Sequence, residues 1–457
     1  GVRVVWAWVW GGGRWAGRTA AGWPASTQLF VLLTLGAAMV GISVSCQTTS
    51  PVEPPEQSAG LEPMIRVRLA STEQTVSVTT DGTPVRWGTG PLGQGDVVVA
   101  VGRATFARTG GAVEAVAGAA TGRSLSGFLS SGEREQRFTV RVGDDDEAEA
   151  TTFDGRLSIS LGARGRLDVI AMLPMERYLE GVLQGELVRG WPLASFQAQA
   201  VAARGYALHE RTRARASGRA FDVESTTLDQ VFAGASGDPR ISEAVETTRG
   251  VVLLDATAPG EPVLRSYYSS TCGGRAASSA GVWPSGAGLR FNAAVPLQGS
   301  LDVCPCEDSP LYRWDRTRTT AEARARLRAW GERAGHPVKR CGRIASIDAA
   351  DLNAVDRPNT FTVEDGSGGE FSLTAEELRV AMNTSVRGQP RVTRESRLPS
   401  GDVRVGVRGS AITLRGRGFG HGVGMCQYGA RGRALRGEDW RGIVVSYYPG
   451  ARLARMW

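Results

Sequence analysis

The sequence predicts an α+β fold, β-rich in its N-terminal part, in which a small helical core interrupts the strands. Three observations support this prediction. Short runs of alternating apolar residues recur over residues 64–173, which is typical of half-buried strands. The period then becomes helical over residues 175–215, and short apolar runs return beyond residue 250. With 457 residues, 42% of them hydrophobic, the chain can form two or three folded units or one large two-lobed unit.

The alternating runs define a β-rich N-terminal part over residues 63–172. Gly, Asp and Pro separate the runs, as they commonly do between strands. Strands are expected at residues 65–70, 75–80, 97–102, 137–142, 157–162 and 167–173.

Three helices are expected after this part. Residues 175–187 place apolar side chains on one helical stripe, and a longer helix follows over residues 191–215, with Pro192 suited to its first turn. A third helix is indicated near Thr319 and Glu322, which are spaced as in a capping box. The remaining residues alternate between short strands and one short helix.

Residues 1–46 are expected to be an N-terminal extension and an export signal. The uncharged run Leu29–Val44 follows Arg14 and Arg18, which is the order found in secretory signals. This run is shorter than the roughly 20 residues of a membrane-spanning helix. We therefore expect an exported protein rather than one held by a permanent transmembrane helix.

Cys46 resembles the lipidated cysteine of a bacterial lipoprotein because small residues precede it, although Ser43 stands where Leu is usual. The Pro-, Ser-, Thr- and Glu-rich residues 47–62 predict a flexible tether that cannot form a core. Together they predict a cell-envelope lipoprotein anchored to the membrane through Cys46. The alternative is ordinary signal cleavage nearby, with loss of Cys46.

The formal net charge of +7 does not predict nucleic-acid binding. The basic residues are almost all arginine, with Lys339 the single lysine, and they are spread along the chain instead of forming a basic run. An exported protein that faces an anionic polymer agrees better with this distribution. Nucleic acid is therefore not an expected partner.

Several motifs follow one another in a fixed order. Residues 176–187 read Glu-Arg-Tyr-Leu-Glu-Gly-Val-Leu-Gln-Gly-Glu-Leu, and residues 191–208 contain Trp-Pro, Ala-Gln-Ala and Ala-Arg-Gly-Tyr-Ala. Residues 229–232 read Asp-Gln-Val-Phe, and residues 266–274 read Ser-Tyr-Tyr-Ser-Ser-Thr-Cys-Gly-Gly. Residues 420–430 read Gly-His-Gly-Val-Gly-Met-Cys-Gln-Tyr-Gly-Ala, ahead of Tyr-Tyr-Pro-Gly at 447–450.

In this order the motifs resemble the stage II sporulation protein D / amidase enhancer (SpoIID) family. The resemblance covers about residues 64–455 and assigns residues 173–457 to a SpoIID-like catalytic core. Two departures stand out: Cys426 replaces the family's Ser, and the segment before Gln230 is shortened.

The resemblance implies a peptidoglycan lytic transglycosylase that acts on peptide-stripped glycan strands, with a cleft between two lobes. Glu186 stands at the matching catalytic position. One carboxyl group suffices, because it can protonate the glycosidic oxygen and then deprotonate the muramyl 6-hydroxyl, which closes the anhydro ring. The apolar sequence around Glu186 is expected to raise its pKa by desolvation. A lone glutamate at a helix end would more often be a surface carboxylate.

Seven further residues are candidates for substrate binding, because polar and aromatic groups commonly line sugar-binding sites. They are Arg204, Gln230, Tyr267, Ser269, His421, Gln427 and Tyr428. For Arg204 the alternatives are a structural salt bridge, an ion pair with Glu186, or a sugar contact. For the others the alternative is hydrogen bonding within turns. His421 lies between two glycines and is the histidine expected nearest the site.

No cofactor is required, and the cysteines leave two interpretations open. A zinc site could form from Cys272, Cys304 and Cys306, with Cys341 as the fourth ligand. Because disulfides are common in exported proteins, a disulfide between Cys272 and either Cys304 or Cys306 is the favoured interpretation. A Cys426–His421 peptidase pair is not favoured, since the sequence shows no oxyanion-hole context.

The expected partners are peptidoglycan glycan strands, a cell-wall amidase as a second candidate, and the membrane through the N-terminal lipid. The alternative function is a non-catalytic, wall-binding amidase enhancer. Glu186 favours the enzyme, because a pure binding protein has no need of it. A metal-dependent hydrolase is not favoured, because the three histidines lack the H-E-x-x-H spacing.

Overall fold

The computed structural model describes residues 60–82, 85–88, 98–100, 102–124, 126–130, 136–143, 145, 148–300 and 303–457. They fall within one unit, Pro55–Trp457. The expected signal segment, the expected lipid site Cys46 and residues 47–59 of the expected tether lie outside the described residues.

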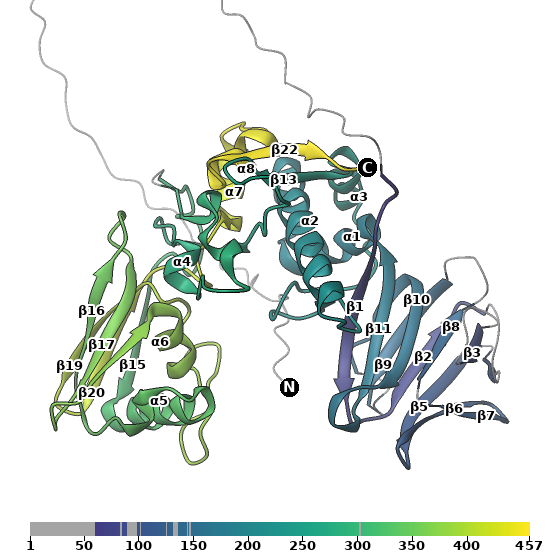
Figure 1. Cartoon of the computed structure of the whole chain (residues 1–457), viewed down its shortest axis with the longest axis horizontal. Helices are drawn as coiled ribbons and strands as arrows, with labels where there is room; N and C mark the ends of the chain where they lie inside the picture. Colours follow the sequence, from purple (N-terminus) through teal and green to yellow (C-terminus); the bar gives the residue numbers. More distant parts are fainter. Residues whose placement is uncertain are drawn as a thin grey trace, which may run out of the picture. The chain divides into compact units, whose positions relative to one another are not determined.

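The N-terminal strands form one mixed sheet, for which twelve strands are found in the described residues (Figure 1). Its strands are β1 (Met64–Thr72), β2 (Val76–Thr80), β3 (Val85–Gly88), β4 (Val98–Ala100), β5 (Arg103–Thr109), β6 (Ala112–Ala117), β7 (Ala120–Ser124), β8 (Ser126–Ser130), β9 (Gln136–Val142), β10 (Thr151–Leu161), β11 (Leu167–Pro174) and β12 (Val223–Glu224). The main path runs β12-β1-β11-β10-β9-β2-β5-β6-β7, and β8 links β3 and β4 to β10. The β1–β12 pair is parallel, whereas β1 and β11 are antiparallel.

The alternating pattern of the sequence explains which face of this sheet is buried. Fully buried side chains recur at every second residue: Ile65 and Val67 on β1, and Leu157 and Ile159 on β10. These side chains belong to one hydrophobic core, which continues into the helices that follow.

Three helices cover this core: α1 (Met175–Glu186), α2 (Leu193–Ala216) and α3 (Pro239–Thr247). Tyr178, Leu179, Val182 and Leu183 of α1 recur at helical spacing and are all fully buried. This packing fixes α1 against the core and holds its last residue, Glu186, at the helix end.

The C-terminal part contains short sheets and further helices. Its strands are β13 (Val251–Asp255), β14 (Tyr268–Ser269), β15 (Trp314–Thr319), β16 (Ile344–Leu352), β17 (Pro358–Asp365), β18 (Glu370–Thr374), β19 (Val403–Arg408), β20 (Ala411–Gly416), β21 (Met425–Cys426) and β22 (Ala451–Arg455). Its helices are α4 (Ser279–Val282), α5 (Thr320–Ala334), α6 (Ala375–Met382), α7 (Gln427–Leu435) and α8 (Trp440–Tyr447). Figure 1 shows β22 beside β13, with which it pairs in antiparallel fashion.

Two large cores lie in this C-terminal part, with a small third one around Val252, Leu254 and Ala454. Helices α5 and α6 pack with strands β15–β20 around Phe361, Leu378 and Leu414. A second core joins α2, α7, α8 and β13 through Val201, Ile443 and the buried cysteines. None of the helices in the described part of the chain is long and apolar enough to cross a lipid bilayer.

The structure confirms the α+β class and the two helices after residue 174. It also confirms the helix at residue 320, where the Thr319 side chain caps the start by accepting the Glu322 N–H. Within the apolar run at residues 263–270, only Tyr268–Ser269 is a strand. Helices α3, α7 and α8 were not expected, and the described residues do not establish the expected cleft.

The C-terminal limit of the expected tether is corrected. The Gly60 N–H donates to the Met456 carbonyl at 3.1 Å, and the Glu62 carboxylate accepts the Glu176 N–H at 2.9 Å and pairs with Arg249. Residues 60–62 are therefore attached to the folded unit, because these bonds fix their backbone against α1 and the C-terminal segment.

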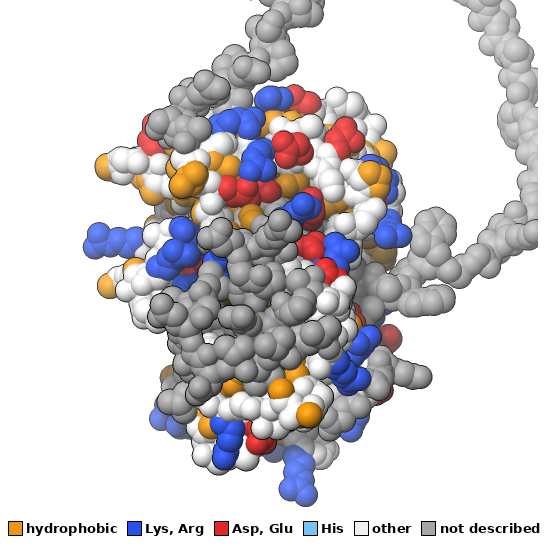
Figure 2. All heavy atoms as spheres, turned by 90° about the vertical axis from the view of Figure 1, so that its right-hand side faces the viewer, with side chains coloured by type: hydrophobic (Ala, Val, Ile, Leu, Met, Phe, Trp, Pro, Cys, Tyr) orange, Lys and Arg blue, Asp and Glu red, His pale blue; other side chains and the backbone are white. Residues whose placement is uncertain are grey.

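Basic and acidic side chains are interspersed on the face of the molecule in Figure 2. Ion pairs also occur in the N-terminal sheet. Arg68 pairs with Glu224, and Arg137 pairs with Asp154 at 2.8 Å. On the visible part of this face, charge of one sign does not dominate.

Candidate active site

Glu186 is positioned by the close approach of a loop to the end of α1. Gly185 precedes it, and a Cβ at Gly185 would lie 2.5 Å from the Val231 carbonyl oxygen, which is far too close. The missing side chain therefore lets the loop containing Val231 lie directly against the helix. As a result, the Val231 N–H donates a hydrogen bond to Glu186 Oε1 at 2.9 Å.

The second carboxylate oxygen of Glu186 faces the glycine-rich signature. Gln427 Nε2 lies 3.3 Å from Glu186 Oε2 and donates to it. The two residues are 241 positions apart in the chain, so the fold alone brings them together. Among the described residues, the hydrogen-bond partners of Glu186 are thus a backbone amide and a neutral side-chain amide, and neither is a second carboxyl group.

The environment of Glu186 favours its protonated form. Desolvation raises the pKa of Glu186 above its ordinary value of 4.5, and the hydrogen bonds from Val231 and Gln427 oppose this shift without cancelling it. The side chain nevertheless keeps part of its solvent exposure. The expected rise in pKa is therefore confirmed in direction, and a proton on Glu186 can still be exchanged.

Gln230 supports this site from behind. It is fully buried, accepts the Tyr178 hydroxyl at 2.8 Å and donates to the Tyr268 hydroxyl at 2.9 Å. Its amide also donates to the Ala203 carbonyl. These bonds fix the residue immediately before Val231. We correct its expected role from substrate contact to support of the loop, because its amide groups are engaged and buried.

Arg204 does not contact Glu186 through a hydrogen bond or an ion pair in the described structure. Its guanidinium group is fully buried and donates to both carboxylate oxygens of Glu176, at 3.1 and 2.6 Å, and to the Val251 carbonyl at 2.9 Å. Of the three interpretations of Arg204, the structural salt bridge is the one that the geometry shows. Because this guanidinium is fully buried and paired, the geometry favours the structural interpretation over a sugar contact.

The glycine-rich segment carries Gln427 to Glu186. Gly418, Gly420, Gly422 and Gly424 all have positive φ, a conformation that glycine adopts readily. After this segment β21 pairs in parallel with β14, and α7 begins at Gln427. The start of α7 is therefore held beside β14, with Gln427 directed at the carboxylate.

An aromatic pair lies close in sequence to both members of this contact. Trp191 is the fifth residue after Glu186, and Tyr428 directly follows Gln427. Their rings meet edge to face with centroids 5.0 Å apart. Tyr428 is partly exposed, which agrees with its candidacy for substrate contact, whereas Trp191 was not among the expected site residues.

Tyr267, Ser269 and His421 form a separate polar and aromatic group. The Tyr267 ring stacks on Trp283 at 4.4 Å, and the His421 ring contacts both. Ser269 Oγ accepts the Gly422 N–H at 3.2 Å. In the described residues, no hydrogen bond joins this group to Glu186, and these contacts match the alternative of hydrogen bonding within turns.

His421 is neutral at neutral pH. Burial lowers the pKa of its imidazole to about 4, and Nδ1 accepts the Val423 N–H at 3.0 Å. A neutral ring that is bonded to its own loop maintains the loop's shape.

The cysteines do not form the expected disulfide. Cys272, Cys304, Cys306, Cys341 and Cys426 are all free thiols in the structure, and Cys272 Sγ lies 3.8 Å from Cys306 Sγ. Cys341 belongs to another core, where its thiol donates to the Gly342 carbonyl, and is therefore not the fourth member of the group. That place is taken by Cys426.

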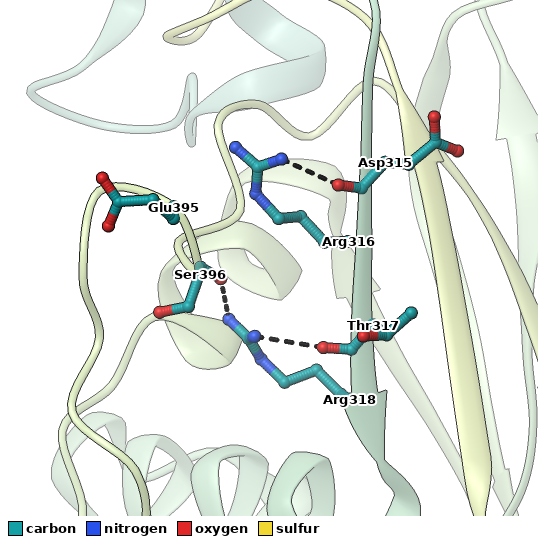
Figure 3. Close-up of a pocket in the computed structure, with 6 residues that line it drawn as sticks. All are labelled: Asp315, Arg316, Thr317, Arg318, Glu395 and Ser396. Carbon is teal, nitrogen blue, oxygen red and sulfur yellow. Dashed lines mark hydrogen bonds between the residues drawn. The ribbon is translucent and has the colours of Figure 1, made fainter.

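A pocket lies in the C-terminal part, away from these residues (Figure 3). It has a volume of about 360 Å³ and is lined by Asp315, Arg316, Thr317, Arg318, Glu395 and Ser396. The guanidinium groups of the pocket donate hydrogen bonds to backbone carbonyls. Arg316 donates to the Asp315 carbonyl at 2.7 Å, and Arg318 donates to the Thr317 and Ser396 carbonyls. The pocket contains none of the predicted site residues, so it does not extend the site at Glu186.

Comparison with known proteins defines the class of protein to which the helical core belongs. Residues 163–254, which include α1, α2 and Glu186, match a family model described as Stage II sporulation protein (SpoIID). Residues 301–424 match a second model, described as a domain of unknown function (DUF8618).

Three relatives extend the match over about three fifths of this chain. An uncharacterised protein of Brachyspira hyodysenteriae is 29% identical over 62% of this chain and 67% of its own length. The amidase enhancer of Bacillus subtilis is 29% identical over 60% of this chain, and stage II sporulation protein D of the same organism is 28% identical over 62%. These matches cover 40% of the enhancer and 75% of the sporulation protein.

The chain belongs to the SpoIID family, as a distant homologue of the amidase enhancer and of stage II sporulation protein D. The resemblance carried by the sequence motifs is thereby confirmed. Family membership implies a role connected with the cell wall.

Proposed function

We propose that this protein is a lytic transglycosylase that cleaves peptide-stripped peptidoglycan strands, with Glu186 as its acid and base. One observation carries the proposal. A carboxyl group with a raised pKa is held between the Val231 N–H and Gln427, a residue of the glycine-rich signature. Family membership supports the substrate class.

The proposed reaction needs one carboxyl group. Protonated Glu186 gives its proton to the glycosidic oxygen, and the bond between that oxygen and the muramyl C1 breaks. The resulting carboxylate takes the proton of the muramyl 6-hydroxyl, whose oxygen forms the new bond to C1. The anhydro ring closes without water, and Glu186 ends the cycle protonated.

The neighbours of Glu186 suit both halves of this cycle. Desolvation raises the pKa of Glu186 and so favours the protonated form that acts as the acid. The Val231 N–H and Gln427 Nε2 then stabilise the carboxylate that forms. Both donors are neutral, so neither holds Glu186 permanently ionised as a guanidinium would.

We assign the partly exposed Tyr428 ring to glycan contact, with the buried Trp191 ring packed against it. Aromatic rings present flat apolar surface to the C–H faces of sugars and are frequent in binding sites. Tyr428 follows Gln427, which is hydrogen-bonded to Glu186. Tyr428→Ala is therefore expected to weaken glycan binding before it affects chemistry.

The test is product analysis of purified, peptide-stripped glycan. Glu186→Gln keeps the size and hydrogen-bonding reach of the side chain but removes the titrating proton. Its release of anhydromuramyl ends should fall by about 10² to 10⁴. Sedimentation with intact sacculi should show that wall binding survives.

Glu180→Gln is the matched control. Glu180 also lies on α1, and its ion pair in the described part of the chain is with the exposed Arg177, at 3.4 Å. Its variant should keep the parental rate. A Glu186→Gln protein that releases anhydromuramyl ends at nearly the parental rate would refute the assignment of Glu186 as the acid.

The alternative function is a non-catalytic amidase enhancer that binds the wall. One relative carries the name amidase enhancer, although the match spans less than half of that protein. Sacculus binding and stimulation of a cell-wall amidase, with no anhydromuramyl product from the parent protein, would establish this alternative.

We also propose export and attachment to the membrane through a lipid on Cys46. The uncharged run ahead of Cys46 and the Pro-rich stretch after it support this. Labelled palmitate should enter the parent and be absent from Cys46→Ala. Label that persists in the variant would exclude Cys46 as the lipid site.

A further inference from the structure

Four buried cysteines converge at one point behind the glycine-rich segment. Cys272 follows β14, Cys304 and Cys306 lie in the 303–309 turn, and Cys426 ends β21. Their sulfur atoms all lie within 4.8 Å of one another. The four residues are at most 5% exposed, so solvent has almost no access to the cluster.

The sulfur spacing fits a tetrahedral metal site. Four thiolates bound to zinc at ~2.3 Å lie about 3.8 Å from one another at the corners of a tetrahedron. Cys272 Sγ and Cys306 Sγ are 3.8 Å apart. A disulfide would require these atoms to approach to about 2 Å.

Small residues on α7 let the turn that carries two of the cysteines reach the cluster. A Cβ at Gly429 would collide with Cys304 Sγ, and a Cβ at Gly432 would collide with the Pro305 carbonyl oxygen. The glycines therefore allow the Cys304-Pro305-Cys306 turn to pack directly on the helix. The Cys306 N–H closes this turn on the Cys304 carbonyl at 2.9 Å.

Neighbouring groups hold the sulfurs in the manner of an outer coordination shell. Cys426 Sγ accepts the N–H groups of Cys272 and Gly429, each at 3.3 Å. Cys304 Sγ lies 3.3 Å from the Tyr447 hydroxyl. Hydrogen bonds of this kind orient ligands and stabilise thiolate charge at metal centres.

We propose that Cys272, Cys304, Cys306 and Cys426 form a structural zinc site. Four protein ligands leave no open position for substrate, so the site serves the fold and not the reaction. The ion joins three segments far apart in the sequence: the chain after β14, the 303–309 turn and the start of α7. Gln427, which contacts Glu186, is the residue next to the ligand Cys426.

Metal analysis of the full chain, purified without added metal or chelator, tests this proposal. About one zinc per chain is expected, and the amount should drop at least tenfold in Cys426→Ser. Cys341→Ser is the matched control, because Cys341 is buried in a different core. That variant should keep its zinc.

A second measurement covers the case in which Cys426→Ser does not fold. Exchange of the parent protein's metal for Co²⁺ should give the intense visible bands and sulfur-to-metal charge-transfer absorption of a tetrahedral four-thiolate site. Four thiols should resist alkylation until a chelator is added, while Cys341 reacts on unfolding alone.

Three results would each overturn the proposal. One is a disulfide that includes Cys272 or Cys426, found by mapping unreduced peptides. Another is a folded protein that contains no metal as purified and in which all four thiols of the cluster can be alkylated. The third is iron in place of zinc. None of these readouts depends on transglycosylase activity, so the zinc site and the proposed function fail or stand separately.

Discussion

The two ends of α1 each carry a buried or partly buried glutamate, and the two carboxyl groups have opposite surroundings. Glu176, at the start, accepts two bonds from the Arg204 guanidinium, one from the Gly250 N–H and one from the Trp457 indole. Glu186, at the end, accepts one bond from a backbone N–H and one from a neutral amide.

This difference shows how one short helix can hold a carboxylate that belongs to the frame and a second carboxyl group that is the proposed acid. The Arg204 guanidinium pairs with the first carboxylate and makes it part of the frame. Without a cationic partner, desolvation dominates at Glu186 and raises its pKa. The local sequence does not distinguish the two residues, because each has apolar neighbours on α1.

The largest expected effect comes from removing the charge partner at the first end. Arg204→Met leaves the buried Glu176 carboxylate without its cation, so the free energy of unfolding should fall by about 3 to 5 kcal/mol. Urea denaturation measures this loss. The fraction that stays folded should keep its rate on stripped glycan, because Arg204 has no contact with Glu186.

Arg213→Met is the control for this variant. Arg213 lies on the same helix and pairs with Glu210 at 3.0 Å, but its side chain is 40% exposed. Its loss should cost under about 1 kcal/mol. Equal destabilisation by the two variants would contradict the structural role given to the Glu176–Arg204 pair.

A smaller effect is expected where the loop meets the second end. Gly185→Ala places a methyl group against the Val231 carbonyl and should cost about 1 to 3 kcal/mol of stability. It should also lower activity, because the Val231 N–H moves away from Glu186. Gly237→Ala is the control, since a Cβ there meets no atom within 4 Å.

The pH dependence of activity should show the effect of the Gln427 hydrogen bond on Glu186. The protonated acid is the active form, so activity should decline as pH rises through the Glu186 pKa, which lies above 4.5. Gln427→Leu removes a bond to the carboxylate. The alkaline limb should therefore move upward by about 0.5 to 1 pH unit. A limb that moves downward would contradict this account, as would an equal shift in the surface variant Gln197→Leu.

The smallest effect concerns stability. The pKa of Glu186 is raised in the folded state, so its protonated form contributes stability below the unfolded value, and this contribution is lost as pH rises through the folded pKa. Glu186→Gln should consequently gain on the order of 1 kcal/mol relative to the parent above that pH. Thermal unfolding at acidic and alkaline pH measures the difference, which should vanish in acid.

Much of the frame could be predicted because local patterns encode it. The alternation in β1 and β10 and the stripe on α1 depend on residues that are neighbours in sequence. The sequence at the start of helix α3 contains helix-start signals that the prediction did not use: Asp238 caps the helix and Pro239 is its first residue. Helix α7 had weaker signals, because it contains two glycines and its cap is the sulfur of Cys426.

The contacts of the site could be predicted less well because long-range packing decides them. Glu186 and Gln427 were each selected from their motifs, but nothing local indicated that they touch. Arg204 pairs with Glu176 because of the way α2 packs against α1. From the sequence alone, an ion pair between Arg204 and Glu186 was an equal alternative. The sequence likewise led to Cys341 as the fourth cysteine, whereas the packing of α7 places Cys426 there.

The hydrogen-bond partners of Glu176 are synthesised at very different times. A chain that leaves the ribosome from its N-terminus supplies Arg204 28 residues after Glu176, the Gly250 N–H 74 residues after it and the Trp457 indole 281 residues after it. At about 5 to 20 residues per second, the last of these follows by tens of seconds. The hydrogen bonds of Glu176, on the helix that carries the proposed acid, are therefore completed long after the strands that precede this helix can pair.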